Sequence, residues 1–184
     1  MAPGALVRRM PARPFHSKLT VMPSFRWVPS ALLCLSLAAC ARPIPNSEAS
    51  VEALAQAVLD AVAARDEAAL RRLALDEQEF REHVWPELPS SRPERNLPFS
   101  YVWGDLRTKS DASLAAMLIE HGGKRYQLER IRFNDGITQY ESSVVHRDST
   151  LEVRGPAGER DSIQLFGSVI QKAGGFKVFS YVVD

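Results

Sequence analysis

Apolar side chains recur at steps of three and four residues through the first half of the chain, which is the spacing of one helix face. Short polar residues that can accept hydrogen bonds from a first helical turn precede these stretches. We therefore expect three amphipathic helices: one carrying Val51 to Val62 with Ser47 as its cap, one beginning at Asp66, and one from the Asp76–Glu79 capping box to Pro86.

The segment from Pro86 to Pro98 is rich in proline, so we expect it to cross the surface as a loop. Helical spacing returns beyond it and predicts a further helix that ends at Gly122. An aromatic group follows the loop directly: Phe99, Tyr101 and Trp103.

After Gly123 the apolar residues alternate with polar ones, which is typical of strands. In the first strand-like run the alternation slips between Leu128 and Ile131, which predicts a bulge. Helices first and strands last define the α+β class, so we expect N-terminal helices packed on a curved C-terminal antiparallel sheet of about five strands. The five runs are residues 124–133, 137–147, 150–154, 161–170 and 175–184.

An uncharged stretch from Trp27 to Ala39 follows the basic residues Lys18 and Arg26, which is the order found in a secretory signal. As a helix this stretch would be roughly 20 Å long, shorter than the ~30 Å hydrocarbon core of a bilayer. We therefore expect residues 1–39 to be a signal peptide, with Met22 as an alternative start that would make it more compact.

The end of this stretch, Leu37-Ala38-Ala39-Cys40, resembles the lipobox of bacterial lipoproteins. The resemblance implies that cleavage makes Cys40 the first residue and that its thiol receives diacylglycerol. Two or more acyl chains hold a protein firmly on a membrane. The alternative is an ordinary signal peptide with a cysteine near its cleavage site. In Gram-negative lipoproteins an aspartate after the cysteine retains the protein in the inner membrane, so Ala41 favours the periplasmic face of the outer membrane.

Removal of residues 1–39 changes the charge of the chain. The whole sequence has 23 Lys and Arg against 22 Asp and Glu, and the signal takes five basic residues and no acidic one, which leaves a net charge of about −4. An acidic chain without a basic face argues against nucleic acid as a partner. Cys40 would be the only remaining thiol, which excludes an internal disulfide.

The mature chain is expected to consist of a lipidated terminus and proline-stiffened tether at 40–46 and one domain at 47–184. The domain is similar to the nuclear transport factor 2-like superfamily, which includes the SnoaL-like proteins. The stretches that carry the similarity are residues 51–73, "VEALAQAVLDAVAARDEAALRRL", and 168–184, "SVIQKAGGFKVFSYVVD". The resemblance implies a cone-shaped roll around an apolar cavity, which members use for catalysis, ligand binding or protein contacts.

Two polar residues of the second strand-like run are the candidate catalytic groups. On a single strand, Tyr140 and His146 would share one face. A histidine there could act as general base, and a tyrosine could donate to a developing oxyanion. A hydrogen-bonded pair with a packing role is the interpretation we favour, because no acidic residue stands isolated among apolar ones as a buried base would.

Two further groups of side chains bear on possible binding sites. Aromatic residues around the proline-rich loop could line a ligand pocket, although packing the loop onto the core is the simpler interpretation: Trp85, Phe99, Tyr101 and Trp103. The histidines lack the paired spacing of metal ligands: His83, His121 and His146. The sequence therefore predicts no metal and no cofactor.

Two functional classes remain. The first is a noncatalytic envelope lipoprotein whose roll binds a small apolar ligand or a partner protein. The second is a membrane-tethered isomerase- or hydrolase-like enzyme that uses a polar group such as His146 in the cavity. An open cavity lined by aliphatic side chains would favour a ligand, and a cavity filled by large aromatic side chains with an apolar patch outside would favour a partner protein.

Overall fold

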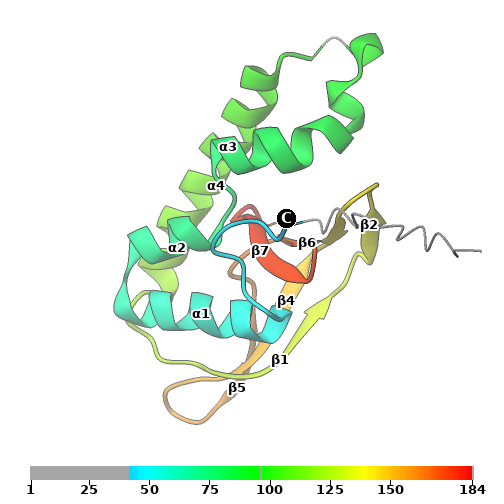
Figure 1. Cartoon of the computed structure of the whole chain (residues 1–184). Helices are drawn as coiled ribbons and strands as arrows, with labels where there is room; N and C mark the ends of the chain where they lie inside the picture. Colours follow the sequence, from blue (N-terminus) through cyan, green and yellow to red (C-terminus); the bar gives the residue numbers. More distant parts are fainter. Residues whose placement is uncertain (1–41, 96, 184) are drawn as a thin grey trace, which may run out of the picture. The chain divides into compact units, whose positions relative to one another are not determined.

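The computed structural model of the chain describes residues 42–95 and 97–183. The expected signal peptide, the lipobox and Cys40 lie outside these residues. Helices precede two antiparallel sheets, so the α+β class expected from the sequence is confirmed (Figure 1). No helix in the described part of the chain is long and apolar enough to cross a bilayer.

The first two helices form where the helical spacing predicts them, as α1 (Val51–Ala64) and α2 (Glu67–Leu73). Ser50 caps α1, because its hydroxyl accepts a hydrogen bond from the Ala53 backbone N–H at 3.1 Å. The expectation of Ser47 as the cap was wrong, since that residue precedes the helix by four positions and lies too far from its first free N–H groups.

The third predicted helix is α-helical only in its first turn. The capping box at Asp76 is present, with hydrogen bonds in both directions between Asp76 and Glu79. Because Pro86 has no N–H to donate, regular α-helical bonding cannot continue through it. The α-helical turn is α3 (Glu77–Glu79). After it the chain proceeds in short turns of other pitch: the π-helical η1 (Phe80–Val84), and the 3-10 turns η2 (Trp85–Glu87), η3 (Pro89–Ser91) and η4 (Pro93–Arg95).

The longest helix, α4 (Phe99–His121), ends before Gly122, as predicted, and it begins earlier than expected, directly after Pro98. The aromatic group expected between the loop and this helix lies within its first turns. In Figure 1 the segment from α3 to η4 lies beside the first half of α4, and side chains of both pack together.

The strand region forms two sheets, in the orders β1-β4-β5 and β2-β3-β6-β7, and every pairing is antiparallel. The register shifts between Leu128 and Arg130, which confirms the predicted bulge. The strands are β1 (Gln127–Phe133), β2 (Ile137–Gln139), β3 (Val144–His146), β4 (Ser149–Arg154), β5 (Arg160–Ile163), β6 (Ser168–Lys172) and β7 (Gly175–Ser180).

The two sheets are joined through kinks in the chain. Backbone hydrogen bonds from Asn134 to Asp148 at 2.9 Å and from Arg147 to Gly136 at 3.0 Å link β1–β2 to β3–β4 across their bends. Ser149 donates likewise to Gly167 at 2.8 Å, beside the bend between β5 and β6. The sequence predicted about five strands, whereas the described residues form seven, because a turn divides the run 137–147 and a bend divides the run 161–170.

Residues 137–147 do not form the single strand that the sequence suggested. They form a hairpin in which β2 and β3 flank a turn, closed by a hydrogen bond from the Tyr140 N–H to the Ser143 carbonyl at 2.9 Å. Within this turn the Gln139 side-chain amide donates to the Tyr140 carbonyl at 3.0 Å and to the Ser143 carbonyl at 3.4 Å. The prediction that Tyr140 and His146 share one strand face was therefore wrong.

Two hydrophobic cores hold the elements together. The main core lies between α1, α2, the second half of α4 and the sheets, and it is mostly aliphatic. The second core lies among the N-terminal segment (residues 42–50), η1, the first half of α4 and the β3–β6–β7 part of the second sheet. Its fully buried members are Ile44, Leu75, Phe80, Val84, Val145 and Ile170.

The N-terminal segment packs on this second core. Ile44 is 3% exposed, and Glu48 exchanges two backbone hydrogen bonds of 2.8 Å with Phe176 on β7. Leu75 donates to Val178 farther along β7 at 3.0 Å, so two segments cover this edge of the sheet. The sequence predicted a tether through residue 46, but the structure makes residues from Ile44 onward part of the domain.

Candidate functional site

Five aromatic side chains from distant parts of the chain form one group, which we call the aromatic cluster: Phe80, Trp85, Phe99, Trp103 and Phe179. Phe80 is 1% exposed and lies at its centre, with ring centroids 5.3 Å from Trp103 and 6.0 Å from Phe179. Trp85 meets Phe99 edge to face at 5.5 Å. These separations are those of favourable aromatic pairs.

The fourth aromatic candidate of the sequence, Tyr101, does not join the cluster. Its side chain is 66% exposed, and the nearby Leu97 is 42% exposed. On another side of the cluster the Arg81 guanidinium lies 3.7 Å from the centroid of Phe99 while pairing with Glu77 at 2.8 Å. Tyr101 is two residues from both Phe99 and Trp103, so it lies on roughly the opposite face of α4 from these two rings.

A buried ion pair fixes the helical side of the cluster to β7. Lys177 Nζ lies 2.5 Å from the Glu79 carboxylate, and the two side chains are 2% and 8% exposed. Lys177 also donates to the Pro45 carbonyl at 2.9 Å, and the second Glu79 oxygen accepts from the Asp76 N–H at 2.9 Å. A buried pair holds its position when further hydrogen bonds satisfy both charges, as they do here.

A second polar contact joins the η2 turn to the β2–β3 hairpin. The Glu87 carboxylate accepts from the Ser142 N–H at 3.1 Å, from the Ser142 hydroxyl, and from the Ser143 hydroxyl at 3.3 Å. Lys172 Nζ lies 3.7 Å from it. Burial alone would raise the pKa of Glu87, but the hydrogen bonds from Ser142 and the charge of Lys172 hold it below its ordinary value.

A narrow cleft, which we call the α2–α4 cleft, opens beside the aromatic cluster. Its cavity volume is about 20 Å³, which is room for about one water molecule. Trp103 and Phe179 of the cluster form part of its apolar wall, and charged side chains form its mouth. The cleft is therefore too small to hold an apolar ligand in this conformation.

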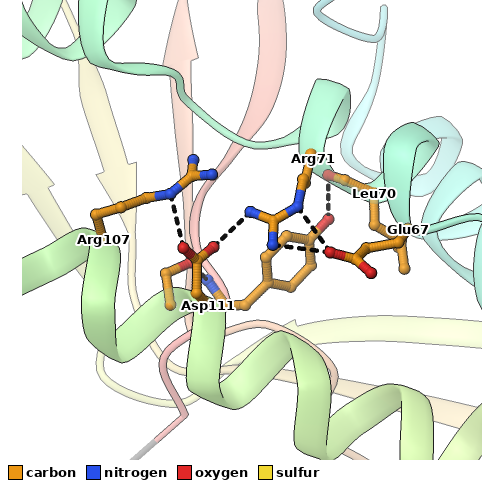
Figure 2. Close-up of polar contacts among 7 residues, drawn as sticks. Glu67, Leu70, Arg71, Arg107 and Asp111 are labelled. Atoms are coloured by element: carbon orange, nitrogen blue, oxygen red, sulfur yellow. Dashed lines mark hydrogen bonds and ion pairs between the residues drawn. The ribbon is translucent and has the colours of Figure 1, made fainter.

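The mouth of the cleft contains a row of alternating charges (Figure 2). Asp111 accepts from Arg71 at 2.5 Å and from Arg107 at 2.9 Å, and Arg71 also pairs with Glu67 at 2.8 Å. The hydrogen bonds to Asp111 and then Glu67 raise the pKa of the Arg71 guanidinium. Each charge faces an opposite one, so the row ties α2 to α4 and leaves no excess charge at the mouth.

Tyr181 occupies the space behind this row. Its side chain is 2% exposed and its hydroxyl donates to the Leu70 carbonyl at 2.6 Å (Figure 2). Its backbone N–H donates to the Ser110 hydroxyl at 3.0 Å. Burial raises the pKa of the Tyr181 phenol, so the group remains a neutral donor. Tyr181 thus fills the interior between α2, α4 and the end of β7.

The structure separates the two candidate catalytic residues of the sequence. His146 lies on β3, where Nε2 is 3.0 Å from Gln171 Oε1 and the ring lies 5.0 Å from that of Phe133. Tyr140 lies in the β2–β3 turn and packs against the second core. Neither lines the α2–α4 cleft.

The remaining histidines are also far apart in the fold. His121 Nδ1 lies 2.9 Å from the Tyr126 hydroxyl at the end of α4, and burial lowers the pKa of this imidazole. His83 belongs to η1. Within residues 42–95 and 97–183, no three His, Cys, Asp or Glu side chains are grouped as ligands of a metal ion.

The sequence identified three of the five aromatic side chains of the cluster, Trp85, Phe99 and Trp103, but missed Phe80, Phe179 and the polar groups that position them. The one available signal was Lys177, a single charge inside the otherwise apolar end of a strand. Glu87 gave no signal, since its partners lie 55 and 56 positions away in the chain. No protein-family model, curated protein or solved structure matches the chain.

Proposed function

We propose that the chain is a noncatalytic, lipid-anchored protein of the bacterial cell envelope whose α+β roll binds a partner protein through the surface around the aromatic cluster. The observation that carries this proposal is the filled interior: large side chains occupy the space between helices and sheets, and the α2–α4 cleft has a volume of only about 20 Å³.

The anchor is inferred from the sequence. Leu37-Ala38-Ala39-Cys40 ends a signal-like apolar stretch, and acylation of Cys40 would hold the domain on a membrane. Ala41 after the cysteine favours the outer membrane, with the domain facing the periplasm.

The roll is inferred from the bends in the antiparallel strands. The chain bends between β1 and β2, between β3 and β4, and between β5 and β6, and backbone hydrogen bonds join these three bends. A sheet that bends in this way curves toward the helices that cover it. This arrangement and the helix order support a cone-shaped roll of the nuclear transport factor 2-like, SnoaL-like kind.

Partner binding is favoured over ligand binding by the distribution of aromatic side chains. Phe80, Phe166 and Tyr181 are each no more than 2% exposed and fill the interior. Tyr101 and Leu97 are exposed at the start of α4, the helix whose Phe99 and Trp103 belong to the aromatic cluster. Aromatic side chains and arginine are enriched at the centre of protein interfaces.

Lipidation is tested by the intact mass of the membrane-extracted protein beside a Cys40→Ser variant. We expect the natural chain to start at residue 40 with added acyl mass and the variant to carry none. A chain with a free thiol at Cys40 would overturn the lipoprotein proposal.

Partner binding is tested with a photo-crosslinking amino acid at position 101, in cells. Position 119 is the matched control, because Ile119 is also an exposed apolar residue on α4, with 83% exposure. We expect one discrete protein adduct from position 101 and none from position 119. Equal adduct patterns, or a stoichiometric small molecule in the native mass of the purified protein, would contradict partner binding at this surface.

A further inference from the structure

The docked N-terminal segment leaves very little free chain between the anchor and the domain. Ile44 is buried in the second core, so only residues 41–43 separate it from Cys40. A fully extended chain advances by at most about 3.6 Å per residue, so the four residues from Cys40 to Ile44 reach about 14 Å at most. This distance is short compared with the size of a domain.

Several contacts hold this segment in place. The Pro45 carbonyl accepts from the buried Lys177 at 2.9 Å, and Glu48 and Phe176 exchange two backbone hydrogen bonds of 2.8 Å. Gly175 permits the close approach, because a side chain at that position would collide with Ser47 and contact Pro43. The chain therefore leaves the domain at a fixed place, beside the β6–β7 turn.

The surface at this place has a distinct chemistry, and we call it the anchor face. Its exposed residues include one positive charge, and the neighbouring carboxylate of Glu48 is only partly exposed, although the mature chain as a whole is acidic. Lipid headgroups carry negative phosphates, so a surface whose one fully exposed charge is an arginine can approach them with little repulsion. The anchor face consists of Arg42, Pro43, Pro45, Asn46, Ala173 and Gly174.

We infer that the anchor face lies against the lipid headgroups, so that the bilayer is itself a binding surface for the domain and fixes its orientation. This inference rests on the proposed acylation of Cys40. It goes further in stating which face meets the membrane and in excluding a domain that rotates freely at the end of a tether. A partner must then be reached close to the membrane surface.

The test compares two labels on the acylated protein in vesicles. Cys40 is consumed by the lipid, so Ala173→Cys and Ala157→Cys each provide one reactive thiol for a fluorophore. Both alanines are exposed in hairpin turns, but position 173 belongs to the anchor face and position 157 to the β4–β5 turn, which lies away from β7 in Figure 1. The vesicles consist of phosphatidylcholine, part of it carrying a nitroxide on the headgroup as a contact quencher.

We expect several-fold stronger quenching at position 173 than at position 157. A Gly-Ser spacer of about eight residues between Arg42 and Pro43 adds a root-mean-square reach of ~16 Å and should abolish most of that difference. The intact mass of each sample is measured first. Acyl mass with equal quenching at both positions would overturn this inference alone, whereas absence of acyl mass would overturn the lipoprotein proposal and this inference with it.

Discussion

The main core and the aromatic cluster bury their side chains to different extents and hold them by different means. Leu54, Val58 and Leu151 of the main core are 0% exposed and lie among other aliphatic side chains. In the aromatic cluster only Phe80 is fully buried, and the rings around it remain partly exposed. The main core is therefore held mainly by close packing, which fixes one arrangement with high density.

The aromatic cluster depends on polar contacts for its position. The Glu79–Lys177 pair connects it to β7, and Glu87 connects it to the β2–β3 hairpin. Segments with little buried apolar surface open more readily than a core does. This contrast suggests that the main core is a rigid scaffold. The geometry of the aromatic cluster is set by a few charged groups, so its surface can adjust to a partner.

Breaking the buried ion pair should have the largest effect on this arrangement. Lys177→Met leaves the Glu79 carboxylate buried without its cation, so we expect a loss of about 3–5 kcal/mol in the free energy of unfolding. Urea denaturation measures this change. The double variant Lys177→Met/Glu79→Gln is the control, because glutamine can still complete the capping box and carries no charge. It should recover a large part of the loss, and failure to recover would show that the loss does not come from the unpaired Glu79 carboxylate.

A pair of truncations compares the two regions directly. Leu54→Ala removes a fully buried side chain from the main core and should cost about 3 kcal/mol, whereas Phe99→Ala removes a half-buried ring and should cost about 1 kcal/mol. Amide hydrogen exchange separates them further. We expect faster exchange throughout the fold in the first variant and only in η1, η2 and the first half of α4 in the second. Equal losses with global exchange in both would contradict the distinction between the regions.

Helices and strands whose apolar residues are regularly spaced could be predicted from the sequence. Features created by long-range polar contacts could not. α1, α2 and the end of α4 follow from apolar spacing and from Gly122, and the bulge after Leu128 follows from a slip in alternation. The β2–β3 hairpin was missed because its turn depends on Glu87, more than fifty residues earlier in the chain. The docking of Ile44 was missed for the same reason, since a short proline-containing stretch gives no local sign of what it packs on.

The smallest and most specific effect is expected from Glu87→Gln, which keeps the shape of the side chain but removes its charge. At pH 7 the variant should lose about 1 kcal/mol, because hydrogen bonds to a charged acceptor are stronger than those to a neutral one.

The pKa of Glu87 is lower in the folded chain than its ordinary value of 4.5, so the folded state favours the ionised form. Its contribution to stability is complete above that ordinary value and disappears as the pH falls through the lowered folded pKa. The difference between natural and variant chains should therefore shrink toward zero in acid. Glu94→Gln, on the exposed η4 turn, is the matched control and should show no such trend in urea denaturation followed from pH 7 downward. A Glu87→Gln difference that stayed constant or grew in acid would contradict the role of the charge in tying the aromatic region to the hairpin.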